Sequence, residues 1–142
     1  MHKRPNVEDL LESICRTDTR YHRDAYQFVR EALDHTQKQV ARTRRTEPRH
    51  VTGQELLEGI RQFALDQFGP MAAVVLAEWG VHRCEDFGEI VFNMIEANLL
   101  GKTDKDSRAD FASTYEFHDA FVKPFLPAEA AKAASEPESK TS

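Results

Sequence analysis

The sequence predicts a mainly α-helical protein, and two observations carry that prediction. Apolar residues such as Leu56 and Ile60 recur at helical spacing over most of residues 21–100. Glycine, proline and capping residues also stand where these apolar stripes begin and stop. We therefore expect a single compact helical domain over residues 1–126, with a three-helix core over residues 52–100.

The ends of the three core helices are marked by local signals. Thr52 and Glu55 form a capping box, in which each side chain satisfies one free backbone amide of the first turn. Gly69 and Pro70 separate the first helix from a short second one, because glycine tolerates the C′ conformation and proline suits a first turn. The third helix follows Gly80. We expect the second helix to turn Met71, Val74, Val75 and Trp79 toward the core.

A long helix is expected over residues 21–42, packed across the core, because its apolar residues keep one face. Asn6 is expected to cap a shorter helix before it. The residues that we expect to be largely buried are Phe28, Val29, Leu33, Leu56, Ile60, Phe63, Val75, Trp79, Phe87, Val91 and Ile95.

The segment after Leu100 has two interpretations. Residues 99–103 and 108–111 can pair as a small β-hairpin across a turn at residues 104–106. Ser107 can equally cap a short helix. We favour the hairpin and keep the helix as the alternative.

Composition limits the class of protein. The chain is 40% apolar, and no apolar run approaches the roughly 18 residues that a membrane span needs. Residues 1–10 lack the apolar stretch of a secretory signal, and two cysteines are too few for a disulfide framework, so we expect a reduced cytoplasmic protein. Residues 127–142 contain no large apolar side chain and are expected to form a disordered tail.

Basic residues cluster in a segment over residues 38–50, which we interpret as a linker because Pro48 ends any helix. A nucleic-acid-binding function through this segment is the alternative to our preferred one, and it would recognise phosphate backbones without reading sequence. The formal net charge of −5 argues against a general nucleic-acid binder. The basic residues are Lys38, Arg42, Arg44, Arg45 and Arg49.

The start of the third core helix is acidic and contains a glycine in the helix interior. Gly88 costs about 1 kcal/mol relative to alanine there, which indicates either a closely packed neighbour or an approaching ligand. We expect this end to attract a basic partner, with the 38–50 segment of the same or a second copy as one candidate. The predicted partner-binding residues are Glu85, Asp86, Gly88, Glu89 and Asn93.

Chemistry-bearing residues do not assemble into a recognisable catalytic or metal motif. His82, Cys84 and Asp86 cluster, but no second ligand pair accompanies them. Neighbouring carboxylates are expected to raise the pKa of Cys84, which disfavours a nucleophile. We predict no catalytic residues, no metal site and no cofactor.

Parts of the sequence resemble two known protein families. The stretches VLAEWGV and FGEIVFNMIEANLLGKTDKDSR are similar to the second helix, recognition helix and wing of the winged-helix repressors that control multiple antibiotic resistance. The acidic end of the third helix argues against DNA readout by such a domain. The stretches RYHRDAYQFVREAL, CEDFGEIVFNMIEANLLGKT and DSRADF, with the core between them, resemble a bacterial family of uncharacterised proteins named after a Minf locus tag.

That second resemblance runs from about residue 21 to residue 125, and it implies a bacterial protein without supplying an activity or functional residues. Taken with the lack of a catalytic constellation, it leaves a non-enzymatic protein-interaction or regulatory module as the expected function. The sequence identifies neither the partner nor the oligomeric state.

Overall fold

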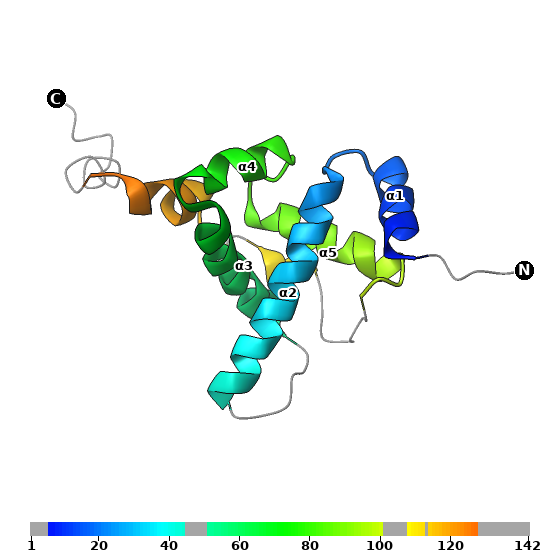
Figure 1. The fold of residues 1–142 in the computed structure, drawn as a ribbon, viewed down its shortest axis with the longest axis horizontal. Helices are drawn as coiled ribbons and strands as arrows, with labels where there is room; N and C mark the ends of the chain where they lie inside the picture. Colours follow the sequence, from blue (N-terminus) through cyan, green and yellow to red (C-terminus); the bar gives the residue numbers. More distant parts are fainter. Residues whose placement is uncertain (1–5, 45–50, 101–107, 113, 128–142) are drawn as a thin grey trace, which may run out of the picture.

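The computed structural model describes residues 6–44, 51–100, 108–112 and 114–127, and these residues form helices and turns without a strand (Figure 1). Its α-helices are α1 (Val7–Thr17), α2 (Arg23–Arg44), α3 (Gly53–Phe68), α4 (Ala72–Glu78) and α5 (Cys84–Glu96). Its shorter helical turns are η1 (Gly69–Met71), η2 (Arg108–Phe111), η3 (His118–Val122) and η4 (Lys123–Phe125).

The predicted helix ends are confirmed where they depend on capping. In α3, the Thr52 side chain accepts a hydrogen bond from the Glu55 amide (3.1 Å), and Glu55 accepts one from the Thr52 amide (3.0 Å). Asn6 caps α1 in the same reciprocal way. Gly69 ends α3 with a φ of 51°, a left-handed value that favours glycine. These capping interactions involve residues within one turn of each other, so tertiary packing does not change where the helices begin and end.

Helix α2 lies across the core and packs against both α3 and α5 (Figure 1). The buried layer includes six of the residues predicted to be buried: Phe28, Val29, Leu56, Ile60, Phe87 and Val91. The other five, Leu33, Phe63, Val75, Trp79 and Ile95, are only partly buried.

Phe63 and Trp79 are partly exposed because they form the edge of an aromatic cluster centred on Phe28. The ring centroid of Phe28 lies 5.4 Å from that of Phe63 and 5.6 Å from those of Phe68 and Trp79. Such rings cover the core from outside while keeping one edge in solvent.

The predicted linker at residue 38 begins too early. Helix α2 starts at Arg23 and continues to Arg44, so Lys38 lies within the helix. Two features keep this part helical: Ala41 is buried against the rest of the protein, and Lys38 pairs with Asp34 one turn earlier (3.0 Å). The rest of the predicted linker, residues 45–50, lies outside the described residues.

The predicted β-hairpin is wrong in the part that the structure describes. Residues 108–111 form the 3₁₀ turn η2, and Leu99 and Leu100 are not in a strand. The turn places Phe111 against α5, where it is 4% exposed. Burying this ring needs a compact turn, which agrees with the helical alternative. Ser107, its predicted cap, and the tail from residue 128 lie outside the described residues.

Helix α4 is rotated relative to its predicted orientation. Met71 and Val74, expected in the core, are 55% and 52% exposed, whereas Ala72 and Leu76 are fully buried. Residues 71–77 are all apolar and only the last residue of α4, Glu78, is polar, so the sequence gives little indication of how this short helix is rotated. Packing against α3 and η3 decides which side faces inward.

Gly88 is explained by close packing, the first of its two interpretations. A Cβ atom built on Gly88 would lie 2.7 Å from the Cβ of Phe111, closer than real side chains approach. The missing side chain therefore lets η2 dock on α5.

Candidate functional site

The predicted partner-binding residues lie along α5 where it meets the loop between α1 and α2. Asp86 accepts a hydrogen bond from the Tyr21 hydroxyl (2.7 Å) and another from the His82 amide (2.9 Å). Asn93 donates to Asp18 (2.9 Å) and to the Tyr26 hydroxyl (3.0 Å). The polar atoms of these predicted residues are thus engaged within the protein.

Arg20, which sequence reasoning missed, links the loop to α5. Its guanidinium donates two hydrogen bonds to the Asp18 carboxylate, from Nη2 to Oδ2 (2.7 Å) and from Nε to Oδ1 (3.0 Å). Nη2 also donates a hydrogen bond to Glu89 (3.2 Å). We call this set the α5 network: Asp18, Arg20, Tyr21, Tyr26, Asp86, Glu89 and Asn93. The Asp-x-Arg spacing of Asp18 and Arg20 was visible in the sequence, but their contact with Glu89, 69 residues from Arg20, was not.

The α5 network perturbs several pKa values in ways that follow from its geometry. Hydrogen bonds from Arg20 hold the pKa of Asp18 well below its usual range. Burial, with the Asp86 carboxylate beside it, raises the pKa of Tyr21. Burial also raises the pKa of Tyr26 to about 12. Asp18 therefore stays ionised and both tyrosines stay neutral at ordinary pH, which keeps the bonding pattern fixed.

The backbone tightens the same junction. The His22 amide donates to the Trp79 carbonyl (3.0 Å), and a Cβ on Gly80 would lie 2.2 Å from the Arg20 carbonyl oxygen. The turn after α4 thus packs directly against the loop between α1 and α2. These contacts give the α5 network a structural role, and its binding of a partner stays a prediction.

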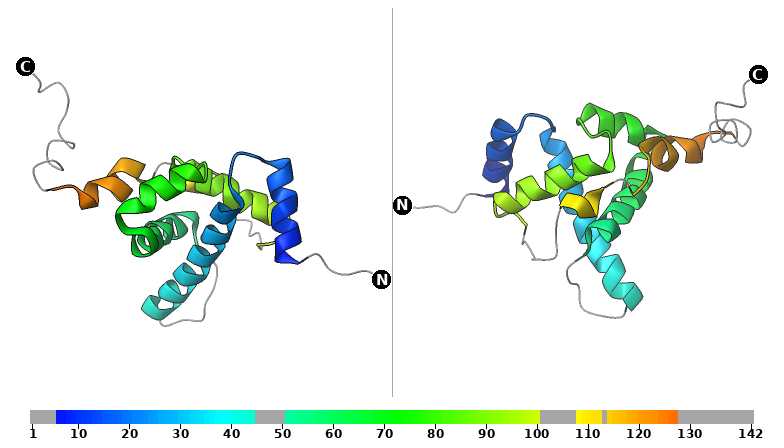
Figure 2. Two further views of the ribbon diagram at one scale, coloured as in Figure 1. Left: turned by 45° about the horizontal axis from the view of Figure 1, so that its top comes forward. Right: turned by 180° about the vertical axis from the view of Figure 1, so that it is seen from behind.

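The basic residues of the 38–50 segment lie away from the α5 network in the part described. The C-terminal end of α2, which carries Lys38, Arg42 and Arg44, points away from α5 (Figures 1 and 2). Glu89 instead takes Arg20 as its cation. Arg45 and Arg49 lie outside the described residues, so their contact with the acidic end stays a prediction.

Cys84 occupies an unreactive environment. It is 1% exposed, and its thiol donates to the Tyr115 carbonyl (3.3 Å). Burial raises the pKa of the thiol, with Glu85 adding to the effect as the sequence predicted. His82 is exposed, and within the described residues no group of three or more His, Cys, Asp or Glu side chains is arranged to hold a metal ion.

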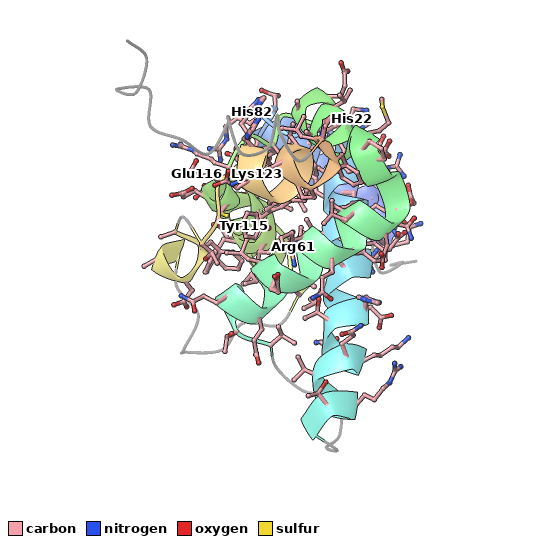
Figure 3. All side chains as sticks on the ribbon, turned by 90° about the vertical axis from the view of Figure 1, so that its left-hand side faces the viewer. His22, Arg61, His82, Tyr115, Glu116 and Lys123 are labelled. Carbon is pink, nitrogen blue, oxygen red and sulfur yellow. The ribbon has the colours of Figure 1, made fainter. Side chains whose placement is uncertain are left out.

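Other polar side chains at this end of the molecule also serve the fold. Tyr115 lies beside α3 and donates its hydroxyl to the Leu57 carbonyl (2.9 Å), while Arg61 pairs with Glu58 (2.7 Å) (Figure 3). His22 and His82 lie away from this pair in the same view. No nucleophile, base and orienting group converge among these labelled residues.

Hollows lie beside several of these helices. One of about 550 Å³ is lined by α2 residues between Gln27 and Lys38 together with Phe63 of α3. Another, of about 270 Å³, lies between α2 and α3, and its lining includes Thr36, Val40 and Gly59. A hollow of about 170 Å³ lies between α1 and α5, next to Asp18 and Asn93. Each is lined by side chains of mixed character, without a converging set of reactive groups.

The exposed large apolar side chains among the described residues lie on η1, α4 and η4. Met71 is 55% exposed, Val74 52% and Phe125 43%. Helix α4 packs on η3, which continues directly into η4, and the three views place η4 beside the start of α4 (Figures 1 and 2). We call Met71, Val74 and Phe125 the α4 surface. Its signal in the sequence is the stretch 67–77, which contains no charged residue in a chain that is 30% charged.

Comparisons add no relative to these observations. No protein-family model, no curated protein and no solved structure matches the chain. None of the helices in the described ranges is long and apolar enough to cross a membrane. The similarities to the Minf-type family and to winged-helix repressors therefore stay predictions from sequence.

Proposed function

We propose that this protein is a non-enzymatic protein-interaction module that binds another protein chain through the α4 surface. The observation that carries the proposal is the exposure of Met71 on η1 and Val74 on α4, two elements in contact, and of Phe125 on η4, which follows the turn η3 that packs on α4. Each of these side chains is at least 43% exposed. Large apolar side chains gathered in one place on a protein surface are typical of interaction sites, whereas isolated ones need no explanation.

The way α4 is anchored supports the proposal. Ala72 and Leu76 are fully buried on its inner side, so Met71 and Val74 are held outward by the packing of the same helix. A surface presented on a fixed element loses little conformational entropy on binding. The uncharged stretch 67–77 adds no charge that a partner would have to desolvate.

This proposal moves the docking surface away from the acidic end of α5. Asp86 already bonds to Tyr21, and Glu89 already bonds to Arg20. Asn93 bonds to both Asp18 and Tyr26. A basic partner would therefore have to compete with these internal hydrogen bonds. The nucleic-acid alternative gains no specific support from the described residues, because Lys38 pairs with Asp34. The winged-helix likeness carries no part of the proposal.

Site-specific photo-crosslinking tests the proposed function. A benzophenone-bearing amino acid is placed at position 74 of the full chain, and at position 39 as the control, because Gln39 is exposed on the distant end of α2. We expect discrete protein adducts from position 74 in cells that express the chain, and a weaker yield when Met71→Ser and Phe125→Ser are added. Equal yields from positions 74 and 39, or no adduct, would overturn the proposal.

A further inference from the structure

We infer that α1 is a displaceable cover, which opens as a unit while α2, α3, α4 and α5 stay folded and so bares the face of α2 and α5 against which it lies. This inference is independent of the α4 surface. Helix α1 lies at one end of the molecule, beside the start of α2 and the C-terminal end of α5 (Figures 1 and 2). Its burial, its packing and its polar contacts each support the inference.

The apolar anchorage of α1 is small compared with that of α5. Of the eleven residues of α1, Leu11 and Ile14 are buried, whereas seven of the thirteen residues of α5 are buried. Proteins open locally in segments that bury few apolar side chains, at a lower free energy than the whole chain needs to unfold. Undocking α1 exposes these two side chains and their immediate surroundings, and it leaves the rest of the core in place.

Packing between α1 and α5 is also incomplete. The lining of the hollow of about 170 Å³ between them includes Ser13, Ile14 and Thr17 on one side and Asn93 and Ala97 on the other. Atoms that border a hollow have no partner on that side, so they attract the opposite helix less than close-packed atoms do. Helix α1 therefore rests mainly on α2.

The chain from Arg20 onward is fixed to α5, which places a hinge just after α1. Arg20 donates a hydrogen bond to Glu89 (3.2 Å), and the Tyr21 hydroxyl donates one to Asp86 (2.7 Å). Asp18, two residues before Arg20, is the C-cap of α1 and has an extended backbone. A change of backbone angles at residues 18 and 19 is thus enough to swing α1 away while the loop keeps its bonds to α5.

Polar contacts near both ends of α1 add to its hold on the body. Glu8 pairs with Arg23, but both side chains are largely exposed, and a solvated ion pair contributes little to stability. Asn93 donates hydrogen bonds to Asp18 (2.9 Å) and to the hydroxyl of Tyr26 (3.0 Å), whose ring is fully buried. Opening α1 breaks the bond between Asp18 and Asn93 and lets water reach the Tyr26 hydroxyl.

Native-state hydrogen exchange of the full chain, measured by NMR over a range of low urea concentrations, tests the inference. We expect the amides of α1 to have protection factors at least about tenfold below those of the most protected amides of α3. We also expect the exchange free energy of α1 to fall less steeply with urea, because opening α1 exposes less surface than global unfolding does.

A matched pair of truncations shows which opening each amide reports. Ile14→Ala removes buried contacts of α1, so the α1 amides should exchange at least about 30-fold faster. Leu76→Ala, at a buried position of α4, should speed the exchange of α3 amides by a similar factor and leave that of α1 unchanged, because α4 stays packed while α1 is open. If Leu76→Ala fails to fold, the urea dependence of the wild type decides alone.

Two outcomes would overturn the inference. Equal protection and equal urea dependence of the α1 and α3 amides in the wild type would mean that α1 opens only when the whole chain unfolds. A similar acceleration of α1 and α3 exchange by Leu76→Ala would mean the same. Neither outcome affects the proposed function, which depends on the crosslinking from position 74.

Discussion

Gly59 on α3 lies against Thr36 on α2 so closely that a Cβ atom built on the glycine would fall 1.8 Å from the threonine Oγ1. Thr36 is itself 3% exposed, and its hydroxyl donates to the Ala32 carbonyl (2.7 Å), so it has little room to move. The absence of a side chain at Gly59 thus sets how closely α2 and α3 approach.

Gly59→Ala is expected to destabilise the protein although alanine is the better helix former. Helix propensity alone predicts a gain of about 1 kcal/mol. Overpacking against buried Thr36 costs about 1–3 kcal/mol, and the 1.8 Å approach favours the upper part of that range, so we expect a net loss of about 1–2 kcal/mol in the free energy of unfolding. Urea unfolding measures it, with Gln62→Ala at an exposed position of the same helix as the control.

A double-mutant cycle links that loss to its cause. Adding Thr36→Ala to Gly59→Ala removes the Oγ1 and Cγ2 atoms that the new Cβ meets, and part of the stability should return. A gain in stability for Gly59→Ala alone, or additive losses in the double variant, would show that the two helices do not meet at this point.

Asp18→Asn tests the α5 network and its pH dependence. Asp18 is 16% exposed at its side chain and bonds to Arg20 and Asn93, but Arg20 is 55% exposed and solvent weakens the pair. We expect a loss of about 1–2 kcal/mol at pH 7. Urea unfolding at several pH values measures it, and Asp66→Asn at an exposed site is the control.

The pH profile of that difference follows from the lowered pKa of Asp18. Above about pH 4 the carboxylate is ionised in both folded and unfolded chains, so its full stabilisation is present. As the pH falls below that value, the unfolded chain takes up the proton first and the stabilisation is lost. A gap between the wild type and Asp18→Asn that stays constant down to pH 2 would contradict the network.

Local signals could be predicted from the sequence, whereas orientation and long-range polar contacts could not. The Thr52–Glu55 capping box and the end of α3 at Gly69 depend only on residues within one turn of each other, so both were predicted correctly from the sequence. The hairpin failed because the docking of Phe111 on α5 decides the backbone there. For the candidate site, Glu89 is bonded to Arg20 across 69 residues, a distance at which periodicity carries no information.

The rotation of α4 can be checked by comparing Leu76→Ala with Val74→Ala. Leu76 is fully buried, so its truncation should cost about 2–5 kcal/mol, whereas truncating Val74, 52% exposed, should cost under about 0.5 kcal/mol in the monomer. Thermal unfolding at low protein concentration gives the ranking. Losses of similar size would place Val74 in the core, as the sequence alone had indicated.

The chain's three tyrosines, Tyr21, Tyr26 and Tyr115, provide a second pH test, since the pKa of each is raised in the folded protein. Burial is the main cause for all three, and that of Tyr26 rises to about 12. We expect almost no phenolate absorbance from the native protein at pH 10, where an unfolded chain in urea would be about half ionised. A native titration with an ordinary midpoint for one tyrosine would show that its ring is open to solvent.

The same shifts predict a loss of stability in alkali. Because the folded tyrosines keep their protons to higher pH than the unfolded ones, their contribution is complete below about pH 10 and is lost as the pH rises further. Tyr115→Phe removes one of these groups together with its hydrogen bond to Leu57, so it should lower stability by about 1 kcal/mol at pH 7 and flatten the decline above pH 10. An unchanged slope in that variant would mean that Tyr115 ionises equally in both states, contrary to the raised pKa that its packing against Phe117 and Phe121 predicts.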